Sequence, residues 1–173
     1  MLKTIRLVSL AGLVLLAALP TRAADLVAGD YELGISALLQ DTDNAGFYLN
    51  IATRVGYMVT KNHEVGPVIS FLYVRPDSGS SITASSLGAF YRYNFSTDNR
   101  YVIPFVGLSA NGYTGDLANS LNWSWQAESG IRLMAGRKVA INNVLFWHRD
   151  YKKAWWVTSE RYFGLSVGVS LFL

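Results

Sequence analysis

The sequence predicts an all-β protein: an eight-stranded antiparallel up-and-down transmembrane β-barrel that follows a cleaved signal peptide. Three observations predict this fold. The N-terminus has an apolar leader segment, eight later segments alternate apolar residues with polar or small ones, and charges of both signs stand in the middle of the polar faces. A period of two residues is typical of a strand with two different faces.

Residues 1–23 have the layout of a secretory signal peptide. Lys3 and Arg6 precede an apolar run over residues 7–19, after which a proline and small residues follow. The run is shorter than the roughly 20 residues that a membrane-spanning helix needs. We expect cleavage after Ala23, so that residues 24–173 form the barrel domain of an exported protein.

The charge balance argues against a nucleic-acid partner. The sequence has 15 Lys and Arg residues against 12 Asp and Glu residues. Three of the basic residues, Lys3, Arg6 and Arg22, belong to the signal segment, so the mature chain is expected to be neutral. The chain has no cysteine, and no cysteine or second histidine stands near His63. We therefore expect no disulfide, no metal site and no cofactor.

The alternation is clearest in four segments. They cover residues 31–39, 46–59, 85–95 and 121–134. In the first segment, Tyr31 and Leu33 share an apolar face, whereas Glu32 shares the opposite face with glycine and serine. In the fourth segment, the apolar face is expected to begin with Leu121 and Trp123. Charged residues would fall on the apolar stripe of a helix, so helical periodicity does not explain these segments.

The remaining strands complete a set of eight. Three are expected near residues 64–75, 101–112 and 138–149, where the alternation is less regular, and the last runs to the C-terminus. Short turns join strands two and three, four and five, and six and seven, whereas the other connections are longer on the whole. The unit is thus a repeated hairpin, and both termini are expected at the end of the barrel with the short turns.

The polar faces carry charges of both signs among glycines. The lumen charges predicted in this way are Glu32, Arg54, Arg92, Glu128, Arg132 and Glu160. Such a face is typical of the inside of a small closed barrel whose outer wall meets hydrocarbon. A soluble sandwich or a lipocalin-like barrel is the alternative, and it would turn these charges outward to water. We expect the charges to pair and the side chains to fill the lumen, which excludes a wide pore.

Aromatic residues gather at both ends of the predicted strands. Tryptophans stand near the longer loops: Trp123, Trp125, Trp147, Trp155 and Trp156. The short-turn end has another group: Tyr57, Tyr93, Phe95 and Tyr101. Two aromatic girdles are expected where a barrel crosses the two interfaces of a bilayer.

The mature chain resembles the small eight-stranded outer-membrane β-barrels of the OmpA/OmpX type. The likeness is carried by "RVGYMVTKNHEVG", by "YRYNFSTDNRYVIPFVGLSANGY" and by the terminal "FGLSVGVSLFL". The last segment resembles the signal that the barrel-assembly machinery reads. Its outward residues are Phe163, Leu165, Val167, Val169, Leu171 and Leu173. The family's signal usually ends in an aromatic residue, whereas here Leu173 is last and Phe172 is out of phase.

The resemblance implies a location and partners. We expect a monomer in the bacterial outer membrane, in contact with membrane lipid and lipopolysaccharide, with a structural or surface-interaction role rather than catalysis. Lipopolysaccharide phosphates would meet basic residues around the last long loop. These are Arg149, Lys152, Lys153 and Arg161. A solvated run of loop charges is the simpler explanation.

An enzymatic alternative rests on His148 and Glu160. Their spacing is similar to that of the PagL-type lipid A deacylases, which pair a His-x-Ser on strand seven with a Glu on strand eight. In that family the histidine is the base, the serine the nucleophile and the glutamate the orienting group. Here Asp150 occupies the serine's position, and Ser159 points to the other side. The simpler interpretation places His148 at the membrane interface and Glu160 in the lumen.

Overall fold

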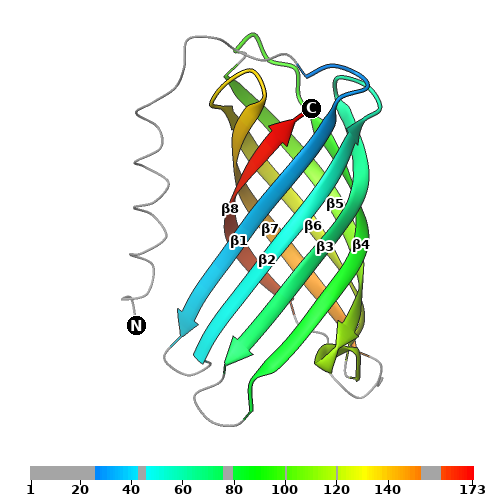
Figure 1. Ribbon diagram of the computed structural model, residues 1–173, viewed down its shortest axis with the longest axis vertical. Coiled ribbons are helices and arrows are strands. Elements are labelled where there is room, and N and C mark those ends of the chain that lie inside the picture. The colour runs from blue at the N-terminus through cyan, green and yellow to red at the C-terminus, as the bar shows by residue number, and fades with distance from the viewer. Residues whose placement is uncertain (1–25, 43–45, 76–79, 100, 120, 153–160) are drawn as a thin grey trace.

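The computed structural model describes residues 26–42, 46–75, 80–99, 101–119, 121–152 and 161–173. They form a closed barrel in which each strand pairs antiparallel with the next and β8 pairs with β1 (Figure 1). The strands are β1 (Tyr31–Thr42), β2 (Gly46–Met58), β3 (His63–Arg75), β4 (Ile82–Asn94), β5 (Val102–Gly115), β6 (Leu121–Met134), β7 (Val139–Lys152) and β8 (Arg161–Phe172). A short 3-10 helix, η2 (Asp116–Asn119), follows β5. Within these ranges, no helix has the length and hydropathy needed to cross a bilayer.

The predicted fold class is confirmed. The four regular segments form β1, β2, β4 and β6, and the three less regular ones form β3, β5 and β7. The C-terminus lies at the same end of the barrel as the short turns (Figure 1). The predicted signal peptide falls on residues outside those that the structure describes, and so do Trp155, Trp156 and Glu160.

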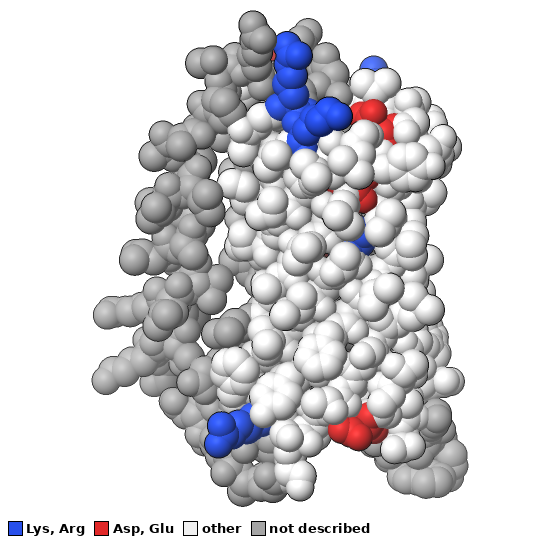
Figure 2. All heavy atoms as spheres, in the orientation of Figure 1, with Lys and Arg blue, Asp and Glu red and all other residues white. Residues whose placement is uncertain are grey.

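The outer wall of the barrel is apolar. Ile35, Ile69 and Leu145, from three different strands, are 53%, 57% and 54% exposed, whereas the inward-facing Arg132 is fully buried. On the face drawn in Figure 2, charged side chains gather towards the two ends and the wall between them is mostly uncharged. Apolar side chains outside and charges inside are the pattern expected of a barrel in hydrocarbon, where the closed sheet satisfies its own backbone groups.

One residue does not follow the predicted alternation. Leu121 was expected on the outer face with Trp123, but it is buried and lines the interior of the barrel. The register between β6 and β7 shifts between Leu121 and Trp123. A β-bulge inserts one residue and reverses the faces beyond it, so Leu121 turns inward and Asn122 turns outward.

The seam between β1 and β8 is shorter than the other strand pairs. The register pairs run from Glu32–Phe172 to Ala37–Val167. Beyond Ala37, the described residues of β1 pair with β2 alone, and the first half of β8 pairs with β7 alone. Gly168 allows close approach in the paired part, because a Cβ there would lie 2.7 Å from the carbonyl oxygen of Ile35.

Candidate functional site

The lumen has two parts with different side chains. The part near the short turns contains buried arginines, glutamates and aromatic rings, and we call it the ion-pair network. The part towards the longer loops is a cavity of about 470 Å³ with polar and aromatic walls. The sequence predicted that side chains would fill the whole lumen, and the cavity departs from that expectation.

Arg132 lies at the centre of the ion-pair network. Its Nη2 lies 2.5 Å from Glu32 Oε2 and 3.3 Å from Glu64 Oε2. Its Nε donates to Asn142 Oδ1 at 3.1 Å, and its Nη1 donates to Asn94 Oδ1 at 3.2 Å. The guanidinium group thus links side chains from β1, β3, β4 and β7 to β6, and ties together strands on different sides of the barrel.

A second group of ion pairs forms around Glu128. Arg54 binds it with two hydrogen bonds of 2.7 Å, and Arg92 donates to the same carboxylate from Nη2 at 2.9 Å and from Nε at 3.2 Å. Arg92 Nη1 also lies 3.6 Å from Glu32 and 3.7 Å from Glu64, so it connects the two groups. Bidentate hydrogen bonds between an arginine and a carboxylate are among the strongest side-chain hydrogen bonds in proteins.

Aromatic rings and a serine complete the network. Arg92 and Arg132 stack over Phe105 at 4.2 and 5.8 Å, and Arg132 also lies 4.9 Å from the ring of Phe172. Ser170 donates to Glu32 and accepts from Asn142. Phe172, which is out of phase with the outward C-terminal residues, therefore packs against the network inside the barrel.

The sequence prediction missed Glu64. Its side chain is fully buried and faces Arg132. A Cβ on the neighbouring Gly56 would collide with the Glu64 carboxylate, so the glycine makes room for it. Glu64 is the second residue of β3, where the irregular alternation of "HEVGPVIS" hid the inward face. With Glu64 included, the described network has three arginines and three glutamates and is neutral.

The cavity owes its volume to small inward residues. Six serines line it, each from a different strand: Ser36, Ser70, Ser86, Ser109, Ser124 and Ser166. At the equivalent inward positions of the ion-pair network, the strands carry Arg, Glu and Phe. Six of the eight strands therefore place a small residue in the cavity wall, and the lumen is open where these serines stand.

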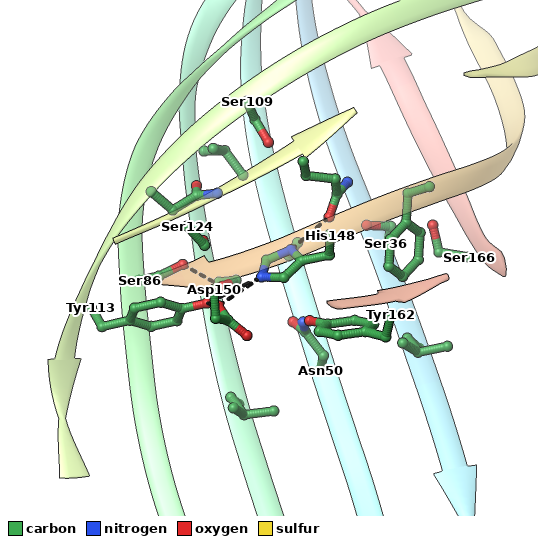
Figure 3. A pocket seen from close by; sticks show the side chains of 18 of the residues that line it. Ser36, Asn50, Ser86, Ser109, Tyr113, Ser124, His148, Asp150, Tyr162 and Ser166 are labelled. Carbon is green, nitrogen blue, oxygen red and sulfur yellow. Dashed lines mark hydrogen bonds and ion pairs between the residues drawn. The ribbon is translucent and has the colours of Figure 1, made fainter. Parts of the chain in front are cut away.

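His148 and Asp150 form the polar centre of the cavity (Figure 3). His148 Nε2 lies 2.9 Å from Asp150 Oδ1 and 3.2 Å from the hydroxyl of Tyr113, which donates to the same carboxylate. His148 Nδ1 lies 3.4 Å from Gln126 Oε1, and its ring stacks on Tyr162 at 4.7 Å. His148 is 7% exposed and points into the barrel, so its expected place at the membrane interface was wrong.

The site for deacylase-type chemistry is incomplete among the described residues. Asp150, which occupies the nucleophile's position, is bound to His148 and Tyr113 and does not supply a nucleophilic hydroxyl. Glu160 and Ser159 lie outside the described residues. In the part of the chain that the structure describes, no group of three or more acidic, histidine or cysteine residues is arranged to hold a metal ion.

The described aromatic residues contact one another at both strand ends. Near the longer loops, Trp123 stacks on Tyr151 at 4.2 Å, and Trp125 and Trp147 meet edge to face at 4.6 Å. Near the short turns, Tyr93 packs against Phe95, and Tyr57 lies 5.1 Å from Tyr31, which the prediction did not include. Tyr101 precedes β5 at the same end.

Solved structures of other proteins share this barrel. Neisserial surface protein A (NspA) is similar with a TM-score of 0.61 and 19% identity over 83% of this chain and 96% of its own. The outer-membrane protein OprG of Pseudomonas aeruginosa follows at 0.54 and 11% over 88% and 99%. The N-terminal barrel of OprF, from the same organism, follows at 0.53 and 12% over 88% and 100%. The fold is that of the small outer-membrane barrels.

The likeness is one of fold. No protein-family model matches the sequence, and no curated protein matches it significantly. The shared fold, together with the apolar outer wall of this chain, identifies an integral outer-membrane β-barrel.

Proposed function

We propose that the protein is a structural or surface-interaction barrel of the outer membrane and is neither a wide pore nor an enzyme. The observation that carries this proposal is the ion-pair network, which joins β1, β2, β3, β4, β6 and β7 across the lumen. Three arginines and three glutamates are 13% exposed or less at their side chains. Removing one member would leave another charge buried without its partner, which is strongly unfavourable. The network is therefore a fixed barrier rather than a gate.

Conductance in planar bilayers tests the barrier. We expect the wild-type barrel to show no porin-sized steps, since we propose that the network closes the lumen to water. The double variant Arg92→Ala/Glu128→Ala removes one charge of each sign and should raise the conductance of small ions. Porin-sized steps from the wild-type protein would contradict the proposal.

The absence of catalysis is tested on lipid A. His148 is already bound to Asp150 and Tyr113, and the position that carries serine in the deacylases carries Asp150. We expect the mass spectrum of lipid A to be the same from cells with and without the protein. Loss of one acyl chain that depends on His148 would establish the enzymatic alternative instead.

A contact with lipopolysaccharide is supported by two basic residues. Arg149 and Arg161 are direct cross-strand partners at the ends of β7 and β8 near the longer loops. Like charges in such a pair repel each other, and an anionic phosphate between them would relieve the repulsion. We propose lipopolysaccharide and membrane lipid as the partners of the monomer in the membrane, and the barrel-assembly machinery during its insertion.

Thermal unfolding tests this contact. Added lipopolysaccharide should raise the unfolding temperature of the wild-type barrel and raise it less for Arg149→Gln/Arg161→Gln. Arg137→Gln, in an exposed short turn at the other end, is the matched control and should respond like the wild type. Equal responses of all three proteins would contradict the proposed contact.

A further inference from the structure

The cavity reaches the outer surface of the barrel through the seam between β1 and β8. Leu38 of β1 and Phe163 and Ser166 of β8 all line the cavity. These residues lie beyond the last register pair of the seam, Ala37–Val167. Phe163 is also 76% exposed on the outer wall. One side chain that borders both the cavity and the membrane marks a lateral opening.

The opening lies at the height of the tryptophans near the longer loops. Phe163 is the register partner of Trp147, and their rings lie 6.4 Å apart. Tryptophan and phenylalanine at this height are typical of the boundary between lipid headgroups and acyl chains. The unpaired backbone edges of β1 and β8 would be costly in pure hydrocarbon, so they favour polar groups at this level.

The polar groups of the cavity wall favour an uncharged ligand over a charged one. Both charges that reach the wall are already engaged, Arg54 by Glu128 and Asp150 by His148. Asn50 Oδ1, Asn111 Oδ1 and Ser124 Oγ are buried and have no hydrogen-bond partner among the described residues. Ser124 is fully buried and lines the cavity (Figure 3). An oxygen without a donor accepts a hydrogen bond from water or from a hydroxyl group of a ligand.

We propose that the cavity binds the uncharged, hydroxyl-bearing head of a single-chain amphiphile that enters sideways from the outer leaflet, because the longer loops of outer-membrane barrels lie on the extracellular side. The head would lie beside Asn50, Asn111 and Ser124, whose unpartnered oxygens have almost no exposed surface in this structure and would accept hydrogen bonds from it once their side chains turn towards it. The acyl chain would leave between β1 and β8, past Leu38 and Phe163, into the membrane. This binding goes beyond the structural role proposed above and does not depend on whether the ion-pair network conducts.

Native mass spectrometry of the barrel released from micelles tests the proposal. Monooleoylglycerol is the probe, oleate is the charged amphiphile with the same chain, and glycerol is the head without the chain. We expect one monooleoylglycerol per barrel, retained about ten-fold more than oleate, because the described residues of the cavity wall include no free cation for a carboxylate. Glycerol alone should not be retained.

Two adjacent substitutions make the test specific. Ser166→Phe places a ring in the mouth of the cavity and should lower retention of monooleoylglycerol about ten-fold or more. Leu165→Phe changes the next residue, which faces the membrane and is 47% exposed, and should retain the probe as the wild type does. Heat-modifiable migration in gels shows whether each variant is folded. If Ser166→Phe does not fold, Asn111→Leu serves in its place, because it removes one of the acceptors.

Three results would overturn the proposal. Equal retention of oleate would show that the head is not recognised. Unchanged retention in the folded Ser166→Phe or Asn111→Leu variant would place the amphiphile elsewhere on the barrel. Binding of glycerol alone would point to entry from water rather than from the membrane.

Discussion

Arg132 makes contacts that no other cation among the described residues makes. It is fully buried and is the only arginine in the described network that bonds to both Asn94 and Asn142. Its loss would leave Glu32 and Glu64 close together, with Arg92 at 3.6 and 3.7 Å as their remaining cation. Burial without a partner makes a charge much more costly than the same charge at the surface.

We therefore expect Arg132→Ala to lower the free energy of unfolding by about 3–5 kcal/mol. Arg137→Ala, at an exposed turn position, should change it by about 0.5 kcal/mol or less. Urea unfolding in lipid vesicles, followed by tryptophan fluorescence, measures both. A second substitution, Glu64→Gln, should recover part of the loss, since it removes one of the two carboxylates. Similar costs for Arg132→Ala and Arg137→Ala would show that the network does not stabilise the barrel.

Gly130 is a second residue at which a small substitution is expected to change the stability of the barrel, because there is no room for a Cβ atom. A Cβ at this residue would collide with the carbonyl oxygen of Asn143 and lie 2.7 Å from the ring of Phe105, which stacks on Arg92. Gly136 lies in a short turn and has no atom near enough to meet a Cβ. Overpacking of a tightly filled site costs about 1–3 kcal/mol.

Gly130→Ala should accordingly destabilise the barrel by about 1–3 kcal/mol, whereas Gly136→Ala should have little effect. The same unfolding experiment compares them. The reason lies in packing, since neither glycine has a positive φ. If both substitutions were neutral, the backbone would have to be free to move away from the Phe105 ring.

At the scale of the strand, the sequence predicted which residues point inward or outward better than it predicted where the strand pairing is interrupted. Apart from Leu121, the outward and inward sets of β1, β2, β4 and β6 follow the alternation, because a strand with one apolar face can adopt only one register. β3 was less regular in sequence because the apolar Val68 shares the inward face with Glu64. The pairing of β2 with β3 also skips Gly66 and Pro67, and proline has no N–H for the sheet. Glu64, just before this interruption, was missed for the same reason.

A bulge is equally hard to foresee. Leu121 continues the apolar alternation of Trp123 and Trp125 in sequence, but the extra residue in β6 turns it into the cavity. Nothing in the residue types marks the position, because the bulge depends on how β6 meets β7 at the end of the sheet.

The outward face of β3 provides a test at the scale of the strand. Ile69 lies in the middle of β3 and is 57% exposed on the outer wall. Val59 is similarly exposed, at 51%, but stands in the short turn after β2. Arginine on a barrel's lipid face costs about 2–4 kcal/mol at the membrane midplane and about 0–1 kcal/mol near the interface.

Ile69→Arg is thus expected to cost about 2–4 kcal/mol of folding free energy in vesicles, and Val59→Arg about 0–1 kcal/mol. Unfolding by guanidinium in lipid vesicles gives both values. A soluble barrel would tolerate arginine at either exposed position, so equal small costs would refute the membrane assignment of this wall.

For the whole molecule, the sequence predicted the charges of the lumen but not its empty space. Pairing could be expected from mid-strand Arg54 and Glu128, since an unpaired charge there would be unstable. The cavity could not be expected in the same way, because its volume depends on six small residues of six strands that meet only when the barrel closes. Their shared type is the signal that could have revealed it.

The two parts of the lumen should differ in access to water, and the absence of cysteine makes this measurable. Ser70 lines the cavity, whereas Ser170 is fully buried in the ion-pair network, between Glu32 and Asn142. In single variants Ser70→Cys and Ser170→Cys, a small aqueous thiol reagent should label the first in the folded barrel and leave the second unlabelled until urea unfolds it. The two substitutions change the same atom, so they differ only in place. Rapid labelling of Ser170→Cys would mean that water crosses the network, and the lumen would then be a channel along its whole length.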